Sequence, residues 1–214
     1  LVNATLAAED HEFYTHRGFR FRSFARAAWA NLRGSRQGGS TITQQLVKNA
    51  ILTPEKTFVR KLKELILSIQ IERKFTKDQI LKMYFNEIPY GGPVYGAAAA
   101  ADYYFGKPVG ELTLAESAIL AALPQSPSRL SPHGPNRDLL ITRTHRILDS
   151  MVKLGLLKPE EATAAKAEEV KFQPPREPIT APHFVFYIRN YLSQRFGEQA
   201  VEQGGLKVIT TLDL

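Results

Sequence analysis

The chain has 214 residues, of which 43% are hydrophobic, so it can bury a core, and disorder of the whole chain is excluded. Lys and Arg number 28 against 21 Asp and Glu, and the net charge of +7 favours a polyanionic partner. Nucleic acid, an anionic membrane surface and a phosphorylated substrate all fit that charge. Without cysteine, a disulfide framework and a thiolate metal site are excluded.

Helical signals dominate the chain. It opens with a helix-like apolar run, Leu1–Leu6, and three later helix starts are marked by Thr53 before Pro54, Thr76 with Gln79, and Thr113 with Glu116. Loops are expected where Pro, Gly and Ser cluster, at residues 34–39, 89–93 and 124–135. The expected helices cover residues 22–33, 41–50, 54–75, 77–87, 94–105, 114–123, 137–154, 159–168 and 182–196.

A change of composition near residue 173 predicts a domain boundary. Pro-rich residues 173–178 are typical of a linker, and residues 204–212 have the alternation of a strand. A lone terminal strand needs a partner, so we expect domains at residues 1–172 and 173–214, the second being the start of a truncated module. Because no initiator Met is present, we also expect an excised segment with a membrane anchor upstream.

Two glutamates, Glu9 and Glu64, flank a basic and hydroxyl-rich stretch. Paired carboxylates can perform acid–base work at a glycosidic centre, and nearby cations can hold a departing phosphate. The helix start at residues 38–41 offers free N–H groups to an anion. Lys48, Arg60 and Lys61 add the positive charge that a diphosphate requires. The pattern therefore favours sugar transfer from a phosphate-activated donor.

Helical geometry supports a special environment for Glu64. Arg60 and Glu64 are four residues apart, a spacing that usually makes a solvated surface pair. Leu67 and Ile71 continue the same stripe, which indicates that Glu64 borders a covered cleft. A separate apolar face of this helix contains Phe58, Leu62, Leu65, Ile66 and Ile69.

Less specific explanations exist for the other candidates. Glu9 and Asp10 also fit an ordinary acidic helix end, His16 a hydrogen-bonded structural residue, and Phe13 a core or cleft-wall position. Glu9, Asp10 and His16 could together hold a metal ion, although their spacing matches no strong ligand pattern. The arginines and aromatic residues interleaved over residues 17–36 suit a membrane interface and a core-facing stripe equally well.

Taken in order, six segments resemble the peptidoglycan glycosyltransferase domain of bifunctional class A penicillin-binding proteins. The resemblance covers roughly residues 1–172, and the tail resembles the linker that enters the transpeptidase module of that family. One departure is Arg143-Thr144, where the family usually has two arginines. The matching segments are Glu9-Asp10-x-x-Phe13-x-x-His16-x-Gly18, Gly39-Ser40-Thr41-Ile42-Thr43-Gln44-Gln45, Arg60-Lys61-x-x-Glu64, Lys77-x-x-Ile80-Leu81-x-x-Tyr84-Phe85-Asn86, Tyr95-Gly96-Ala97-Ala98 and Tyr104-Phe105-Gly106-Lys107.

The resemblance implies a mainly α, lysozyme-like fold with a small membrane-contacting jaw subdomain near residues 17–36. It implies polymerisation of lipid II into β-1,4-linked glycan strands, with inversion and release of polyprenyl diphosphate. Glu9 would be the base on the acceptor hydroxyl, and Glu64 would assist on the donor side, with Mg²⁺ or Mn²⁺ as an open option. Substrate-binding residues would be Asp10, Phe13, His16, Ser40, Thr41, Gln44, Gln45, Lys48, Asn49, Arg60, Lys61 and Asn86.

The same resemblance implies a location at the extracytoplasmic face of the bacterial cytoplasmic membrane. Lipid II, the growing glycan strand, an anionic membrane surface and moenomycin-type inhibitors would be the partners, and nucleic acid would not. We expect Glu9 and Glu64 to face each other across one cleft, farther apart than the ~5 Å of a retaining glycosidase pair. Competing interpretations are a lytic glycosidase, a basic nucleic-acid-binding domain and an inert membrane-surface module.

Overall fold

A computed structural model describes residues 1–20, 39–52, 57–175, 181–203 and 205–212. The chain divides into two compact units, Leu1–Pro174 and Pro175–Leu214, close to the boundary expected after residue 172. Almost all regular structure in the described residues is helical, which confirms the expected mainly α fold. The only sheet in those residues has two strands.

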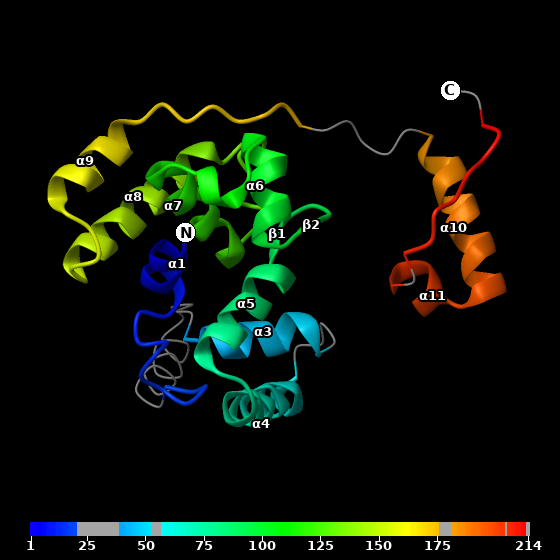
Figure 1. Cartoon of the computed structure of the whole chain (residues 1–214), viewed down its shortest axis with the longest axis horizontal. Helices are drawn as coiled ribbons and strands as arrows, with labels where there is room; N and C mark the ends of the chain where they lie inside the picture. The colour runs from blue at the N-terminus through cyan, green and yellow to red at the C-terminus, as the bar shows by residue number, and fades with distance from the viewer. Residues whose placement is uncertain (21–38, 53–56, 176–180, 204, 213–214) are drawn as a thin grey trace. The chain divides into compact units, whose positions relative to one another are not determined.

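The first unit contains one group of helices around a buried centre. This group contains α1 (Val2–Glu9), α6 (Ala97–Phe105), α7 (Leu114–Ala122), α8 (Arg137–Lys153) and α9 (Pro159–Ala167). Every residue of α7 from Ala115 to Ala122 is buried, because α1, α6, α8 and α9 pack around it (Figure 1). A helix that is apolar on nearly all sides is buried in this way at the centre of a domain.

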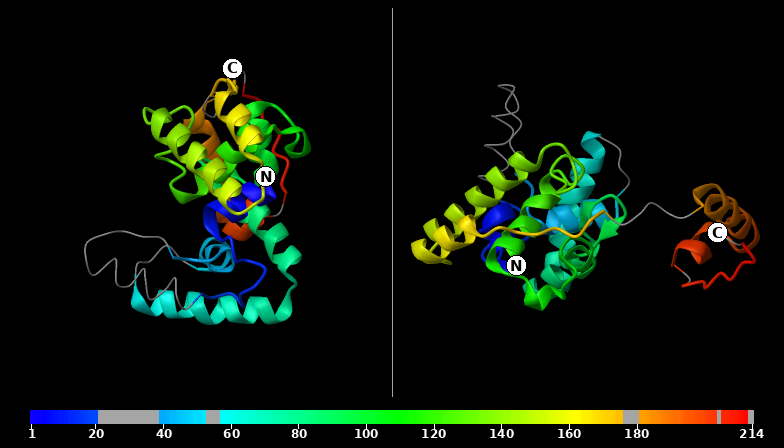
Figure 2. Two further views of the ribbon diagram at one scale, coloured as in Figure 1. Left: turned by 90° about the vertical axis from the view of Figure 1, so that its left-hand side faces the viewer. Right: turned by 90° about the horizontal axis from the view of Figure 1, so that it is seen from above.

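A second group of helices carries the segments between the two candidate glutamates. Helix α3 (Ile42–Ala50) packs against both α4 (Phe58–Lys74) and α5 (Lys77–Glu87). The left-hand view of Figure 2 shows α4 running along the lower edge of the unit beside α3. Helix α5 leads back toward α6 and so joins the two groups.

Capping residues determine where several helices begin. The predicted capping boxes Thr76–Gln79 and Thr113–Glu116 are both present, each with reciprocal side-chain and backbone hydrogen bonds. A third box joins Thr41 and Gln44 at the start of α3. Helix α4, however, has Thr57 as its N-cap, so our expectation that it starts at Pro54 is wrong.

Residues 89–96 form a short hairpin that the sequence did not predict. Strands β1 (Pro89–Gly91) and β2 (Val94–Tyr95) pair antiparallel where we expected a loop and the first turn of a helix. Gly96 then has φ 84°, and a Cβ there would lie 2.9 Å from the Asn86 carbonyl oxygen. Because the left-handed backbone interrupts the helix, α6 starts only at Ala97. Short 3₁₀ turns, η1 (Val109–Glu111) and η2 (Leu123–Gln125), flank α7.

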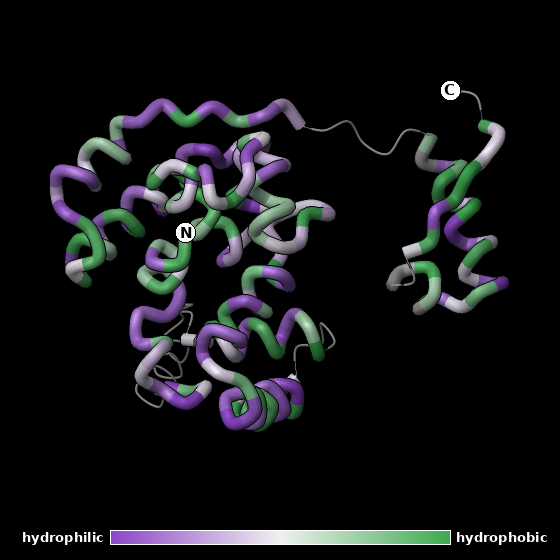
Figure 3. Tube along the Cα trace, viewed as in Figure 1, coloured by the Kyte–Doolittle hydropathy of each residue, from purple (hydrophilic) through white to green (hydrophobic). Residues whose placement is uncertain are grey.

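The amphipathic helix α4 turns the side that carries Glu64 and Ser68 toward the protein interior. It contains both hydrophilic and hydrophobic residues (Figure 3). Glu64 and Ser68 are buried, whereas Val59, Leu62 and Ile66 are about half exposed, at 61%, 49% and 48%. The predicted apolar face is therefore partly open to solvent, and the side of the helix that carries Glu64 is covered.

The second unit consists of α10 (Pro182–Phe196) and α11 (Glu198–Gln203), which pack on each other. The strand expected over residues 204–212 is not formed in the described part of that segment, residues 205–212. A strand is defined by ladder hydrogen bonds to a neighbour, and the described residues of this unit supply no second strand.

Candidate active site

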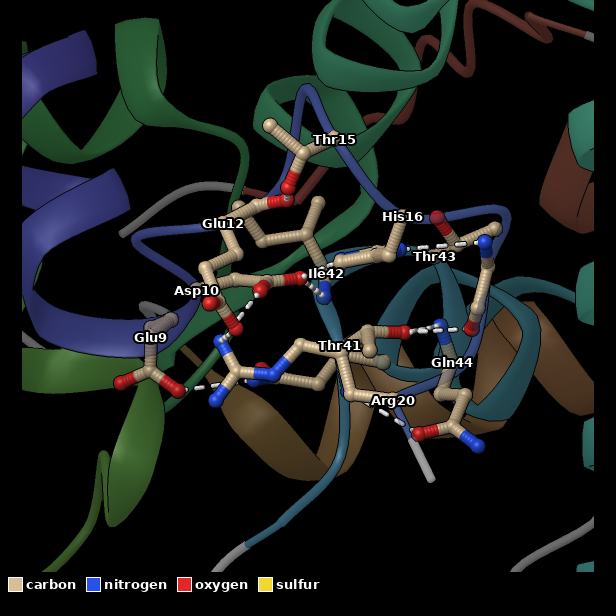
Figure 4. Close-up of polar contacts among 12 residues, drawn as sticks. Glu9, Asp10, Glu12, Thr15, His16, Arg20, Thr41, Ile42, Thr43 and Gln44 are labelled. Atoms are coloured by element: carbon tan, nitrogen blue, oxygen red, sulfur yellow. Dashed lines mark hydrogen bonds and ion pairs between the residues drawn. The ribbon is translucent and has the colours of Figure 1, made fainter. Parts of the chain in front are cut away.

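Asp10 joins the end of α1 to the start of α3. Its Oδ2 accepts hydrogen bonds from the backbone N–H of Ile42 at 3.1 Å and from Nε2 of His16 at 2.8 Å, and its Oδ1 accepts from Arg20 at 3.1 Å (Figure 4). The Asp10 side chain is almost completely buried, at 2% exposure for the residue. This carboxylate therefore determines where α1 ends relative to the first turn of α3.

His16 has a structural part in this junction. Its Nδ1 accepts the backbone N–H of Gly18 at 3.1 Å, so the ring proton lies on Nε2, which donates to Asp10. The carbonyl of Gly18 in turn accepts the hydroxyl of Thr41 at 2.8 Å. The loop after Asp10 is thereby fastened to the N-terminus of α3.

Glu9, the last residue of α1, is held at both carboxylate oxygens. Its Oε1 accepts from Nη2 of Arg143 at 2.8 Å, and its Oε2 accepts from Nε2 of Gln45 at 2.7 Å. Arg143 is itself oriented by a 3.0 Å hydrogen bond from its Nε to the Ala122 carbonyl. Three helices, α1, α3 and α8, thus position one carboxylate.

Burial raises the pKa of Glu9 above its ordinary value of 4.5, and the charge of Asp10 adds to this effect. The hydrogen bond from Gln45 and the charge and hydrogen bond of Arg143 act in the opposite direction. A carboxylate oxygen has more than one lone pair, so each oxygen can still accept a further proton donor. This combination is the one that a general base on a weakly acidic hydroxyl requires.

A cavity of about 420 Å³ opens over Glu9. Glu9 is the only acidic residue among its lining residues in the described part of the chain. The rest of its lining is Ala8, Ser40, Gln45, Lys48, Asn49, Pro89, Pro124, Gln125, Pro127 and Arg143. The predicted residues Glu9, Ser40, Gln45, Lys48 and Asn49 therefore share one cavity.

Glu64 lies beside that cavity and reaches it through a chain of contacts. Arg60 Nη1 donates to Glu64 Oε2 at 3.0 Å, and Lys61 Nζ contacts the other oxygen. The same Lys61 Nζ lies 2.9 Å from the hydroxyl of Ser40, a cavity-lining residue. Glu64 is buried and does not itself line the cavity. The expectations that it borders a covered cleft and that the two glutamates face each other across one cleft therefore stay predictions.

The remaining predicted site residues lie outside the cavity lining. Thr41 and Gln44 are buried in the capping box of α3, and Phe13 is fully buried in the core. Lys77 lies over the Phe13 ring, 4.4 Å from its centroid. Asn86 is exposed at the end of α5. None of the four predicted residues Phe13, Thr41, Gln44 and Asn86 therefore lines the cavity. Of the expected jaw, residues 21–38 lie outside the described residues.

The possible metal ligands among the described side chains do not form a cluster. Over the described residues, no group of three or more His, Asp or Glu side chains could hold one. Asp10 and His16 bind each other, and both oxygens of Glu64 are occupied by Arg60 and Lys61. We therefore assign no step of the reaction to Mg²⁺ or Mn²⁺.

Comparison with known proteins identifies the family. The model of the transglycosylase family matches residues 1–152. The chain belongs to the transglycosylase family. The resemblance to the glycosyltransferase domain of class A penicillin-binding proteins is thereby confirmed, and with it the enzyme class, a peptidoglycan glycosyltransferase domain.

Named relatives agree with this assignment. The chain is 42% identical to penicillin-binding protein 1A of Aquifex aeolicus over 100% of its own length, and 41% identical to that of Pseudomonas aeruginosa over 99%. It spans only 30% and 26% of those two proteins. The crystal structure of penicillin-binding protein 1A from Haemophilus influenzae matches with a TM-score of 0.51 and 28% identity, over 75% of this transglycosylase chain and 20% of the other.

Arg143 is the site residue that the sequence did not assign. It belongs to the Arg143-Thr144 departure, where the family usually has two arginines and the missing second arginine made any role doubtful. The structure brings it to Glu9 across 134 positions of sequence. The first arginine of that motif was the available signal.

Proposed function

We propose that this domain polymerises lipid II into β-1,4-linked glycan strands by inverting transfer, with Glu9 as the general base. The observation that carries the proposal is the carboxylate of Glu9, whose side chain is only 11% exposed, is held at both oxygens and lines a cavity that Lys48 also lines. A sugar hydroxyl is a weak acid, and a base whose proton affinity is raised by burial suits it.

The reaction moves one proton and exchanges one bond. Glu9 accepts the proton of the acceptor 4-hydroxyl, and the oxygen attacks the anomeric carbon of the donor. The bond between that carbon and the diphosphate oxygen breaks, and its electron pair leaves with the polyprenyl diphosphate. Attack on the face opposite the leaving group inverts the anomeric configuration.

Cations on one side of the cavity would stabilise the departing diphosphate. Lys48 lines the cavity, and Lys61 reaches its edge at Ser40. Glu64 holds Lys61 and Arg60 in place through its two oxygens. In this scheme Glu64 orients the cations, and Ser40, Gln45 and Asn49 contact sugar and phosphate groups.

The lytic glycosidase alternative is less well supported. A glycosidase uses two carboxyl groups that flank the scissile bond. Among the described residues that line the cavity, only Glu9 is acidic, whereas Lys48 and Arg143 bring positive charge. Neutralisation of a phosphate leaving group therefore explains the site better than protonation of a sugar leaving group.

A membrane surface is the second proposed partner, and the extracytoplasmic face of the bacterial cytoplasmic membrane the proposed location. The described helices include none that is long and apolar enough to cross a bilayer. The half-exposed stripe of Val59, Leu62 and Ile66 on α4, with Lys63 beside it, suits contact with an anionic lipid surface. In this scheme the net charge of +7 serves binding of diphosphate and anionic lipid rather than of nucleic acid.

A moenomycin-type inhibitor would occupy the cavity over Glu9.

Incubation with lipid II, followed by separation of glycan polymer, tests the proposal. Glu9→Gln should lower the rate by about 10²–10⁴-fold, the usual contribution of a general base, while the thermal melting curve stays cooperative. Glu12→Gln is the matched control, since this nearby glutamate is exposed and should retain the wild-type rate. Wild-type polymer yield from Glu9→Gln would refute the assignment of the base.

A further inference from the structure

The hydroxyl of Tyr84 lies behind the catalytic cavity. Tyr84 belongs to α5, is fully buried against α3, and places its Oη 3.4 Å from Oε1 of Gln45. Gln45 lies between Tyr84 and Glu9, since its Nε2 donates to Glu9 Oε2 at 2.7 Å. One side-chain amide thus connects a buried phenol to the carboxylate.

The amide of Gln45 has two ends of nearly the same shape and opposite hydrogen-bonding character. With the nitrogen toward Glu9, the amide donates to the ionised carboxylate. With the oxygen toward Glu9, two acceptors would face each other. A donor at the far end of the amide favours the first orientation, and the Tyr84 hydroxyl is such a donor.

The electrostatic surroundings keep this phenol in its donor form. Burial, and next the negative charge of Glu9, hold the pKa of Tyr84 well above its ordinary value of 10. The hydroxyl therefore retains its proton at any pH at which a cell-wall enzyme works, and the contact with Gln45 persists.

We propose that Tyr84 is a positioning residue for the transfer reaction: through Gln45 it directs an N–H donor at Glu9 and so keeps the base ionised and oriented. The proposal rests on the role of Glu9 as base. Tyr84 touches neither substrate nor reacting atoms, and its effect reaches the chemistry only through the amide of Gln45.

Tyr84→Phe removes the hydroxyl and keeps the ring. We expect kcat for lipid II polymerisation to fall about two- to threefold, the lower end of the range for one hydrogen bond because the contact is long, with KM little changed. Because ionised Glu9 loses part of its support, the acid limb of the pH–kcat profile should move to higher pH. Loss of packing alone would lower the rate without moving that limb.

Tyr104→Phe is the matched control. It removes another buried tyrosine hydroxyl, which donates to the Tyr90 carbonyl at 2.9 Å. Its acid limb should coincide with that of the wild type. An unmoved limb in Tyr84→Phe would overturn the proposal.

A double-mutant cycle locates the effect. Gln45→Ala should move the acid limb at least as far as Tyr84→Phe, and adding Tyr84→Phe to Gln45→Ala should change it no further. An unmoved limb in Gln45→Ala would also overturn the proposal, even if Tyr84→Phe did not fold. Activity retained by Glu9→Gln would instead refute the base itself, which separates the two failures.

Discussion

The carboxylate of Glu9 and the guanidinium of Arg143 form an ion pair of 2.8 Å inside the first unit, between the end of α1 and the middle of α8. Burial lowers the pKa of Arg143 and raises that of Glu9, and each charge opposes the shift of the other. The pair therefore favours the ionised form of the proposed base, whose side chain is only 11% exposed. If Glu9 is the base, the rate of reaction also depends on a residue distant in sequence.

Removing the positive charge of Arg143 should change the pH dependence of catalysis. In the wild type, the acid limb of the pH–rate profile should lie above pH 4.5, because the proposed base Glu9 must be deprotonated to act and its pKa is raised. Arg143→Gln should move that limb further up, since the lowering effect of Arg143 is lost. Polymerisation rates across a pH series give the limb directly.

Arg146→Gln is the control for this measurement, because Arg146 is exposed on the same helix and pairs with no carboxylate among the described residues. Its limb should stay in the wild-type position. A downward move in Arg143→Gln would contradict the sign of the interaction with Glu9.

Asp10→Asn should destabilise the first unit. The amide that replaces the carboxylate cannot accept from Ile42, His16 and Arg20 together, so at least one buried donor loses its partner. The expected loss is about 1–3 kcal/mol in the free energy of unfolding, measured by urea denaturation. Asp78→Asn is the matched control, because that exposed side chain keeps an acceptor for Tyr14 and should change stability by less than about 0.5 kcal/mol. Equal losses would show that Asp10 is not a structural junction.

Gly18→Ala should cost more stability than Gly155→Ala. Both glycines have positive φ, 82° and 69°, so the backbone penalty is shared. A Cβ at Gly18 would lie 2.8 Å from the Ser68 carbonyl oxygen, whereas nothing lies within 4 Å of a Cβ at Gly155. The difference between the two melting temperatures isolates the close approach of the loop to α4. Identical melting temperatures would mean that this approach is loose in solution.

Substitutions on the exposed stripe of α4 should weaken membrane association. Leu62→Ser and Ile66→Ser each remove an apolar side chain that a lipid surface could cover, worth about tenfold in partitioning to anionic vesicles. Leu139→Ser, at a similarly exposed position of α8, should leave partitioning unchanged. Vesicle sedimentation measures the partitioning of each variant. Equal effects at all three positions would argue against a specific membrane face on α4.

Local sequence signals predicted helix starts well where hydrogen bonds between residues close in sequence decide the structure. Capping threonines such as Thr76 and Thr113 determined helix starts because their hydrogen bonds are made within four residues. Prediction failed where pairing with another segment of the chain decides whether a strand forms. The hairpin at residues 89–95 depends on pairing between two very short strands. Residues 205–212 have strand-like alternation, and the described residues of their unit offer no second strand for pairing.

For the site, the sequence by itself determined the chemical inventory: two glutamates, the cations near Glu64, the hydroxyl-rich start of α3, and a family resemblance that the comparisons confirm. Tertiary structure decided how those groups are used. Only packing of α1, α3 and α8 brings Gln45 and Arg143 to Glu9. Only the orientation of α4 buries Glu64, which contacts Lys61. The reason is physical: residue types and short spacings are encoded locally, whereas burial, and with it the pKa of Glu9, exists only once distant helices exclude water from the same place.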